Sequence, residues 1–182
     1  MAKIILGFVG KIASGKDVSK KYLEEHHGAS SHRFSTMLRD ILDRLYLPIT
    51  RERLQDLSFD LRQRFGSDTL ARVIAQDVSR DPSELVIVEG IRRLADIVEL
   101  KNFPNFYLIS IDAEPETRYD RVIKRNENIG DSDKTFPQFV AEEQREAERE
   151  IPIVMSQAHF KVDNNGSFSD LYKQLEDIIN KL

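Results

Sequence analysis

The residues Gly10 to Asp17, which read G-K-I-A-S-G-K-D, have the spacing of a phosphate-binding loop. Two glycines separated by four residues let the backbone curl, so that successive N–H groups point at a bound anion. Lys16 would reach the β- and γ-phosphates of a nucleotide. A glycine-rich turn without a ligand is the simpler alternative. The order of elements favours the phosphate loop, because residues 4–9 precede it as a buried strand and residues 18–25 can follow it as a helix.

Asp17 departs from the usual form of this loop, in which a serine or threonine hydroxyl follows the lysine and binds Mg²⁺. A carboxylate is also a hard oxygen ligand, so magnesium binding is compatible with it. It places one more negative charge near the phosphates. We therefore expect Lys11, Lys16 or a nearby arginine to offset the charge of Asp17.

Glu89 follows the apolar run Leu85–Val88 and precedes Gly90. An acidic residue at the carboxyl end of a central strand, beside a phosphate loop, is the usual second anchor for Mg²⁺. The alternative is a strand-end carboxylate that caps the next helix. Arg92 and Arg93 come directly afterwards, where a positive side chain could meet the phosphate of an acceptor. Arginines at a helix start oppose the helix dipole, so their position indicates some other benefit.

A second group of arginines lies on one face of a helix that is expected to begin near Pro115, within about sixty degrees of one another. They are Arg118, Arg121 and Arg125. Three like charges on one stripe repel each other unless an anion is bound. The alternative is a solvated face that is paired with Glu114, Asp120 and Glu127. Arg145 and Arg149 repeat the pattern in an acidic segment, whose glutamates could neutralise them.

The bulk composition excludes several functions. A net charge of −4 argues against a general binder of nucleic acid or of membrane surfaces. The chain has no cysteine, which excludes disulfides, thiolate metal sites and a cysteine nucleophile. The apolar start is too short for a signal peptide or a membrane span, so the cytoplasm is the expected location.

The 182 residues suit one α/β domain, in which continuous apolar runs form a parallel sheet and amphipathic stretches form the crossovers. The expected strands are 4–9, 29–34, 85–88, 106–111 and 159–162. The expected apolar helix stripes are 37–45, 54–65, 70–78 and 168–182. About fifty residues separate the second strand from Leu85, enough for a helical flap that carries a second substrate. Residues 126–134 are polar and turn-rich and suit a mobile cover that keeps water from a reacting phosphate.

Together these motifs resemble the P-loop nucleotide kinases, namely nucleoside monophosphate kinases, phage deoxynucleoside monophosphate kinases and dephospho-coenzyme A kinases, over nearly the whole chain. The resemblance implies a three-layer α/β/α P-loop fold with a five-stranded parallel sheet. Its core would be residues 1–34, 84–125 and 158–182. An acceptor-binding helical insert would occupy about 35–80, and a lid about 126–150.

The resemblance also implies roles for single residues. The segment Phe34–Arg39 is similar to the adenylate-kinase segment after the second strand, which gives Arg39 the acceptor phosphate. Glu89–Arg93 resembles an acid-glycine-x-x-arginine element, which gives Glu89 a magnesium-bound water and Arg93 or Arg92 the acceptor phosphate. Arg121 and Arg125 match two arginines that lead into the lid, one of which packs on the adenine. Residues 158–164 resemble the late strand of dephospho-coenzyme A kinases, whose following turn borders the base.

One departure bears on the acceptor. Dephospho-coenzyme A kinases carry an aspartate near the end of the second strand that helps to deprotonate a sugar hydroxyl, whereas residues 30–35 here contain no acid. A hydroxyl acceptor must lose a proton, and a phosphate acceptor is already an anion. This favours a nucleoside monophosphate. Asp17 weighs partly the other way, because it is a spare carboxylate.

The resulting hypothesis is a phosphotransferase that moves the γ-phosphate of ATP, with Mg²⁺, to a nucleoside monophosphate-type small molecule. Nucleic acid and membranes are not expected partners, and the chain would act as a monomer or homodimer. The residues expected to bind ATP are Gly10, Lys11, Ala13, Ser14, Gly15, Lys16, Asp17, Val18 and Arg121. The expected catalytic residues are Lys16, Arg93, Arg121 and Arg125, the acceptor residues Arg39, Arg92 and Arg93, and the metal ligands Asp17 and Glu89.

Three alternatives were weighed against this hypothesis. A dephospho-coenzyme A kinase and a non-catalytic ATP-binding protein both remain open. A GTPase switch is excluded because its guanine-reading N-K-x-D motif is absent.

Overall fold

The computed structural model describes residues 3–125, 133–143 and 149–182. Its centre is one sheet of five parallel strands in the order β2-β3-β1-β4-β5. In chain order the strands are β1 (Ile4–Val9), β2 (Ser30–Arg33), β3 (Leu85–Glu89), β4 (Phe106–Asp112) and β5 (Phe160–Asp163). The expected strands are confirmed. Most of their boundaries differ from the expected ones, in each case by one residue.

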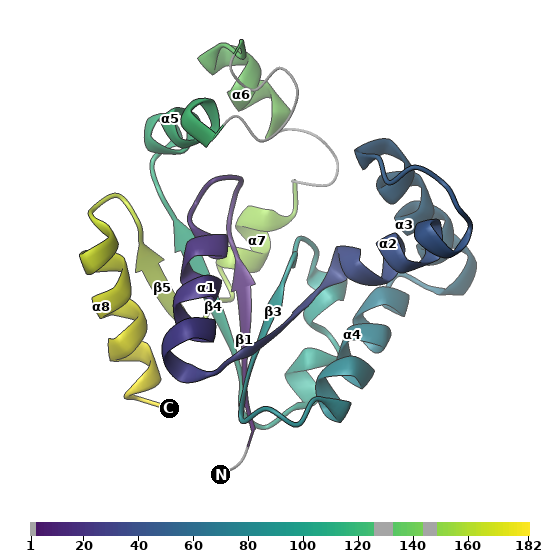
Figure 1. Cartoon of the computed structure of the whole chain (residues 1–182), viewed down its shortest axis with the longest axis horizontal. Helices are drawn as coiled ribbons and strands as arrows, with labels where there is room; N and C mark the ends of the chain where they lie inside the picture. The colour runs from purple at the N-terminus through teal and green to yellow at the C-terminus, as the bar shows by residue number, and fades with distance from the viewer. Residues whose placement is uncertain (1–2, 126–132, 144–148) are drawn as a thin grey trace.

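Helices connect the strands and cover the sheet (Figure 1). The α-helices are α1 (Lys16–His27), α2 (Phe34–Arg44), α3 (Arg51–Phe65), α4 (Thr69–Arg80), α5 (Pro115–Arg125), α6 (Phe136–Glu142), α7 (Ile151–Met155) and α8 (Phe168–Ile179). Two short 3₁₀-helices, η1 (Leu94–Ile97) and η2 (Leu100–Asn102), follow β3. Within the described ranges, none of these helices has the length and apolarity that a membrane span requires.

Alternation along the strands divides the core into two layers, because successive side chains of a strand point to opposite faces of the sheet. Ile5 and Val9 of β1 pack with buried residues of α2, α4 and α7. Leu6 and Phe8 of the same strand pack with Leu23 of α1 and with buried residues of α8. The chain is therefore a three-layer α/β/α structure, as expected, and both faces of its sheet are covered.

The ends of several helices have recognisable signals. Ser167 caps α8, and its hydroxyl accepts a hydrogen bond from the backbone N–H of Asp170. Asp68 is the N-cap residue of α4, although its side chain makes no capping bond and pairs with Arg72 at 3.4 Å instead. Tyr46, two residues after the end of α2, is in the left-handed conformation, with φ of 57°.

The parallel arrangement brings the carboxyl ends of all five strands to one edge of the sheet. The loop between β1 and α1 lies at this edge (Figure 1). Helices α5 and α6 lie above that loop in this view, and α2 and α3 project to one side of it. Residues 126–132 of the expected cover, together with Arg145 and Glu127, lie outside the described residues. Ligands of open α/β sheets bind at this edge, so it is the place to look for a site.

Candidate nucleotide-binding site

The phosphate loop, residues Gly10–Lys16, joins β1 to α1 and requires glycine at both ends. A Cβ on Gly10 would lie 2.1 Å from the carbonyl oxygen of Ile111. A Cβ on Gly15 would lie 2.0 Å from Nδ2 of Asn164, and the φ of Gly15 is +110°. Both glycines of the motif are therefore explained by close contacts and not by turn propensity alone.

Lys16, the first residue of α1, folds back over the phosphate loop. Its Nζ donates hydrogen bonds to the carbonyl oxygens of Gly10 at 2.6 Å and Lys11 at 2.8 Å. The N-cap residue of α1, Gly15, supplies no side-chain cap, so the first N–H groups of the helix have no capping side-chain acceptor. A helix start of this kind, beside an ammonium group, attracts a phosphate.

Asn164 and Arg121 tie the phosphate loop to the turn after β5. Asn164 is 3% exposed, and its Nδ2 donates to the carbonyl oxygen of Ser14 at 2.7 Å. Arg121 donates to the carbonyl oxygens of Asn164 at 2.7 Å and Ala13 at 3.4 Å, and its burial lowers the pKa of the guanidinium. Arg121 thus lies against the loop that is expected to bind ATP, whereas Arg125 is exposed at the end of α5.

Arg118 differs from the expected stripe of three arginines. Its side chain is 1% exposed, lies 5.5 Å from the ring centroid of Phe139, and donates to the carbonyl oxygen of Ala113 at 2.9 Å. Its other partner is Glu143, at the end of α6, and not Glu114 or Asp120. Neither an anion site nor a solvated face was therefore a correct interpretation for Arg118. The long-range partner could not be seen in the spacing on α5.

Glu143 also binds Lys11 of the phosphate loop, whose Nζ lies 2.9 Å from Oε2. Burial alone would raise the pKa of Glu143, but the hydrogen bonds from Arg118 and Lys11 outweigh it and hold that pKa below its ordinary value. One carboxylate thus links α5, α6 and the phosphate loop. Lys11 is occupied by this contact and does not offset Asp17.

Asp17 and Glu89 are linked by a residue that the sequence analysis had not singled out. Arg33, the last residue of β2, pairs in the sheet with Glu89, the last residue of β3. Its Nε lies 3.3 Å from Oε1 of Glu89, and its Nη2 lies 3.6 Å from Oδ1 of Asp17. Lys20 of α1 also contacts Oε1 of Glu89, at 3.4 Å.

These two carboxylates fit a magnesium ion in their chemistry. Both offer hard oxygens at the carboxyl edge of the sheet, and both already contact one shared cationic group. In the described ranges, no group of three or more His, Cys, Asp or Glu side chains forms a ready metal cage. In phosphoryl transfer, Mg²⁺ takes one or two carboxylates and completes its shell with water and phosphate oxygens.

The residues expected to bind the acceptor lie on two elements. Arg39 is exposed on α2. The backbone N–H groups of Arg92 and Arg93 donate to Oδ2 of Asp96, at 2.9 and 3.0 Å. Asp96 is 2% exposed and also pairs with Arg62 of α3 at 2.7 Å. This carboxylate at the start of η1 offsets the unfavourable position of the two arginines, a benefit that needs no acceptor phosphate.

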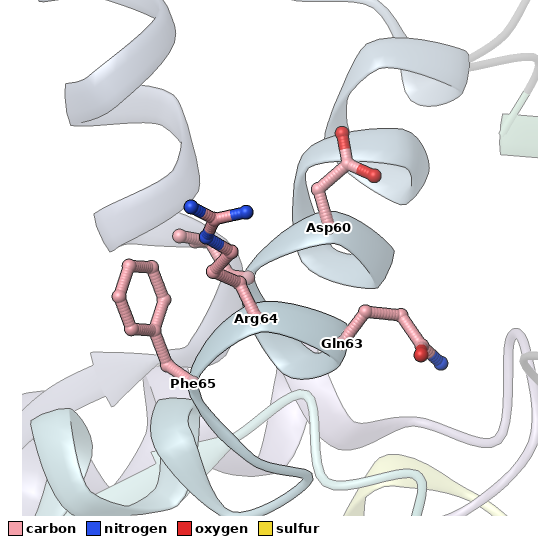
Figure 2. A pocket seen from close by; sticks show the side chains of 5 residues that line it. Asp60, Gln63, Arg64 and Phe65 are labelled. Atoms are coloured by element: carbon pink, nitrogen blue, oxygen red, sulfur yellow. The ribbon is translucent and has the colours of Figure 1, made fainter.

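A hollow of about 600 Å³ lies on α3 (Figure 2). Its lining residues are Asp60, Leu61, Gln63, Arg64 and Phe65. None of them belongs to the phosphate loop or to a strand end, although all five lie in the helical insert of about 35–80 that was expected to bind the acceptor. The phosphate loop and the strand ends therefore remain the candidate site.

Sequence reasoning assigned no role to four residues that the structure places at the candidate site, namely Lys20, Arg33, Glu143 and Asn164. A signal existed for Arg33, because it ends a parallel strand just as Glu89 does, but only acidic strand ends had been considered. Asn164 directly follows the late strand and is likewise at this edge. Lys20 and Glu143 meet their partners across 69 and 132 residues of sequence, and nothing local indicates those contacts.

Comparison with known proteins agrees with this architecture. No protein-family model matches the chain. A UPF0200 protein of Staphylothermus marinus is 26% identical over 182 residues, which cover 100% of this chain and 94% of that protein. Crystal structures of TT1252 from Thermus thermophilus and of a shikimate kinase from Bacteroides thetaiotaomicron superpose with a TM-score of 0.63 each. Their identities are 20% and 11%, and each alignment covers at least 98% of both chains. The chain therefore has the fold of the P-loop kinases.

Proposed function

We propose that the chain is a phosphotransferase that moves the γ-phosphoryl group of ATP to a small acceptor that itself carries a phosphate, of the nucleoside monophosphate type. The observation that carries this proposal is the arrangement at one sheet edge: a glycine-bounded phosphate loop with Lys16, and beside it the Asp17–Glu89 pair. The P-loop kinase fold supports it.

In this reaction the loop amides and Lys16 would hold the β- and γ-phosphates of the donor. Arg121 would keep the loop and the turn after β5 together where the base is expected, and Arg125 would reach the donor from the lid. Asp17 and Glu89 would hold Mg²⁺, the latter through water. The bound ion would neutralise charge on the transferred group. Most of the catalysis would be positioning and electrostatic stabilisation.

The acceptor side would be formed by the insert at about 35–80, with Arg39, and by Arg92 and Arg93 after β3. The residue at the end of β2 favours a phosphate acceptor over a hydroxyl. It is Arg33, a permanent cation, where dephospho-coenzyme A kinases carry an aspartate that deprotonates a sugar hydroxyl. A guanidinium suits an acceptor that arrives as an anion and needs no general base.

The test is ADP release from Mg-ATP in the presence of candidate acceptors. The panel holds the common ribo- and deoxynucleoside monophosphates, dephospho-coenzyme A, phosphomevalonate and shikimate, the last because a shikimate kinase shares the fold. We expect stimulation by at least one nucleoside monophosphate. A response only to dephospho-coenzyme A or shikimate would replace the phosphate acceptor with a hydroxyl acceptor. ATP binding without any response would indicate a nucleotide-dependent partner protein.

The matched variants are Lys16→Ala and Lys21→Ala. Both remove a lysine of α1, but Lys21 is exposed and pairs with Glu25 on its own helix, at 3.6 Å. We expect Lys16→Ala to abolish transfer with the unfolding temperature preserved and Lys21→Ala to keep full activity. Wild-type transfer by Lys16→Ala would contradict the assignment.

A further inference from the structure

The guanidinium of Arg33 occupies the position between the two carboxylates that are expected to bind metal. Both of its contacts, 3.3 Å to Glu89 and 3.6 Å to Asp17, exceed the roughly 2.7–2.9 Å of a good charge-assisted hydrogen bond. The Arg33 side chain is 47% exposed, whereas that of Glu89 is 4% exposed. The Arg33 side chain is therefore weakly held, whereas its partner Glu89 is fixed by burial.

Charge balance explains why Arg33 lies there. Glu89 is buried, and a buried carboxylate needs a cation close to it. Arg33 and Lys20 supply two positive charges against the two negative charges of Glu89 and Asp17, so the group is neutral. A divalent ion on the same carboxylates would bring a further two charges beside the guanidinium, and the half-exposed arginine is free to turn towards solvent.

We propose that Arg33 is a positioning residue that exchanges partners: it neutralises Asp17 and Glu89 until a divalent cation binds them, and is then released towards the anionic acceptor. This inference rests on the proposed function. Binding of the metal and binding of the acceptor would then each strengthen the other, because both favour the conformation in which Arg33 has left the two carboxylates.

The experiment compares Arg33→Gln with the wild type in two assays. The first is electron paramagnetic resonance titration of Mn²⁺ into protein saturated with a non-hydrolysable ATP analogue, with no acceptor present. We expect Arg33→Gln to bind Mn²⁺ about tenfold more tightly, because one positive charge beside a divalent ion is removed in a half-exposed site. The second is the KM of the acceptor found in the panel, which we expect to rise at least about tenfold, the loss of one charge-assisted contact.

Arg80→Gln is the matched control, because Arg80 is an exposed arginine in the last turn of α4, on the connection to β3 and away from the phosphate loop. It removes the same charge and should change neither quantity. Arg33→Lys keeps the positive charge. It should keep the Mn²⁺ affinity within about twofold of the wild type, because the effect of residue 33 on that affinity comes mainly from its charge.

The proposed exchange predicts that Arg33→Gln changes the two constants in opposite directions: Mn²⁺ binds more tightly, and the KM of the acceptor rises. Weaker binding of both Mn²⁺ and acceptor in Arg33→Gln would show a merely structural role and overturn the proposal, as would an unchanged Mn²⁺ affinity. A failure of the proposed function looks different, because the wild type would then give no acceptor-stimulated ADP release or no analogue-dependent Mn²⁺ binding.

Discussion

Glu143→Gln should destabilise the protein by about 2 kcal/mol, because it leaves a buried guanidinium without its charged partner. Removal of one member of a fully buried ion pair costs about 3–5 kcal/mol. Arg118 is 1% exposed and Glu143 11%, so most of that penalty applies. Arg118 keeps its bond to Ala113 and its contact with Phe139, and glutamine still offers an oxygen, which together lower the cost.

The assay is urea unfolding at neutral pH, with thermal unfolding alongside. A loss of about 2 kcal/mol corresponds to a drop of roughly 4–8 °C in a domain of this size. The control is Glu25→Gln, which removes an exposed carboxylate that is paired with Lys21 on the same helix, and it should cost less than about 0.5 kcal/mol. If Glu143→Gln unfolds within about 1 °C of the wild type, the contact does not carry the stability that we assign to it.

The carboxylate of Glu143 also makes the stability of the protein depend on pH, in a direction that can be predicted. The pKa of Glu143 is lowered in the folded state, so its contribution to stability is complete above the ordinary glutamate pKa. That contribution is lost as pH falls through the folded pKa, because the protonated acid no longer pairs with Arg118 and Lys11. The wild type should therefore lose its advantage over Glu143→Gln in acid, below about pH 4.

Two further predictions concern the backbone. Gly15→Ala should abolish binding of a fluorescent ATP analogue and cost at least about 2 kcal/mol in urea unfolding, because its Cβ would meet Asn164 at 2.0 Å and φ is +110°. Adding Asn164→Ala should recover only part of that loss, and full recovery would show that the clash alone mattered. Tyr46→Gly should stabilise the protein by about 1 kcal/mol, since Tyr46 follows the C-cap of α2, is 88% exposed and has a φ of 57°. Tyr46→Ala, which keeps a Cβ, should give no such rise in unfolding temperature.

The features that could be predicted from sequence are those that local pattern determines. The phosphate loop needs a strand, two glycines, a lysine and a helix within 25 residues, and all of these lie in the first part of the chain. The strands could be found because a doubly covered parallel sheet needs continuous apolar runs. The apolar face of α2 also followed from spacing, although the helix begins at Phe34, which was expected to end the preceding strand.

The partners of charged side chains could not be predicted in this way. The stripe of arginines on α5 was visible in the sequence. Arg118 is nevertheless buried, because it packs on Phe139 of α6 and pairs with Glu143 at the end of α6. The pair Arg92 and Arg93 was visible too, but the carboxylate that accepts hydrogen bonds from their backbone N–H groups is Asp96, in the short helix that follows them. An ion pair depends on which surfaces the fold brings together, and the sequence spacing of one member does not contain that information.

The two departures of this chain from the kinase pattern are linked by electrostatics. The expectation was that Lys11, Lys16 or an arginine would offset the extra charge of Asp17. Lys11 binds Glu143, Lys16 donates to loop carbonyls, and the contact to Asp17 comes from Arg33. Arg33, a cation, ends β2, and Asp17, an acid, follows the lysine of the phosphate loop. Either residue without the other would leave an unbalanced charge beside the buried Glu89, whereas Arg33 and Lys20 together balance the charges of Asp17 and Glu89.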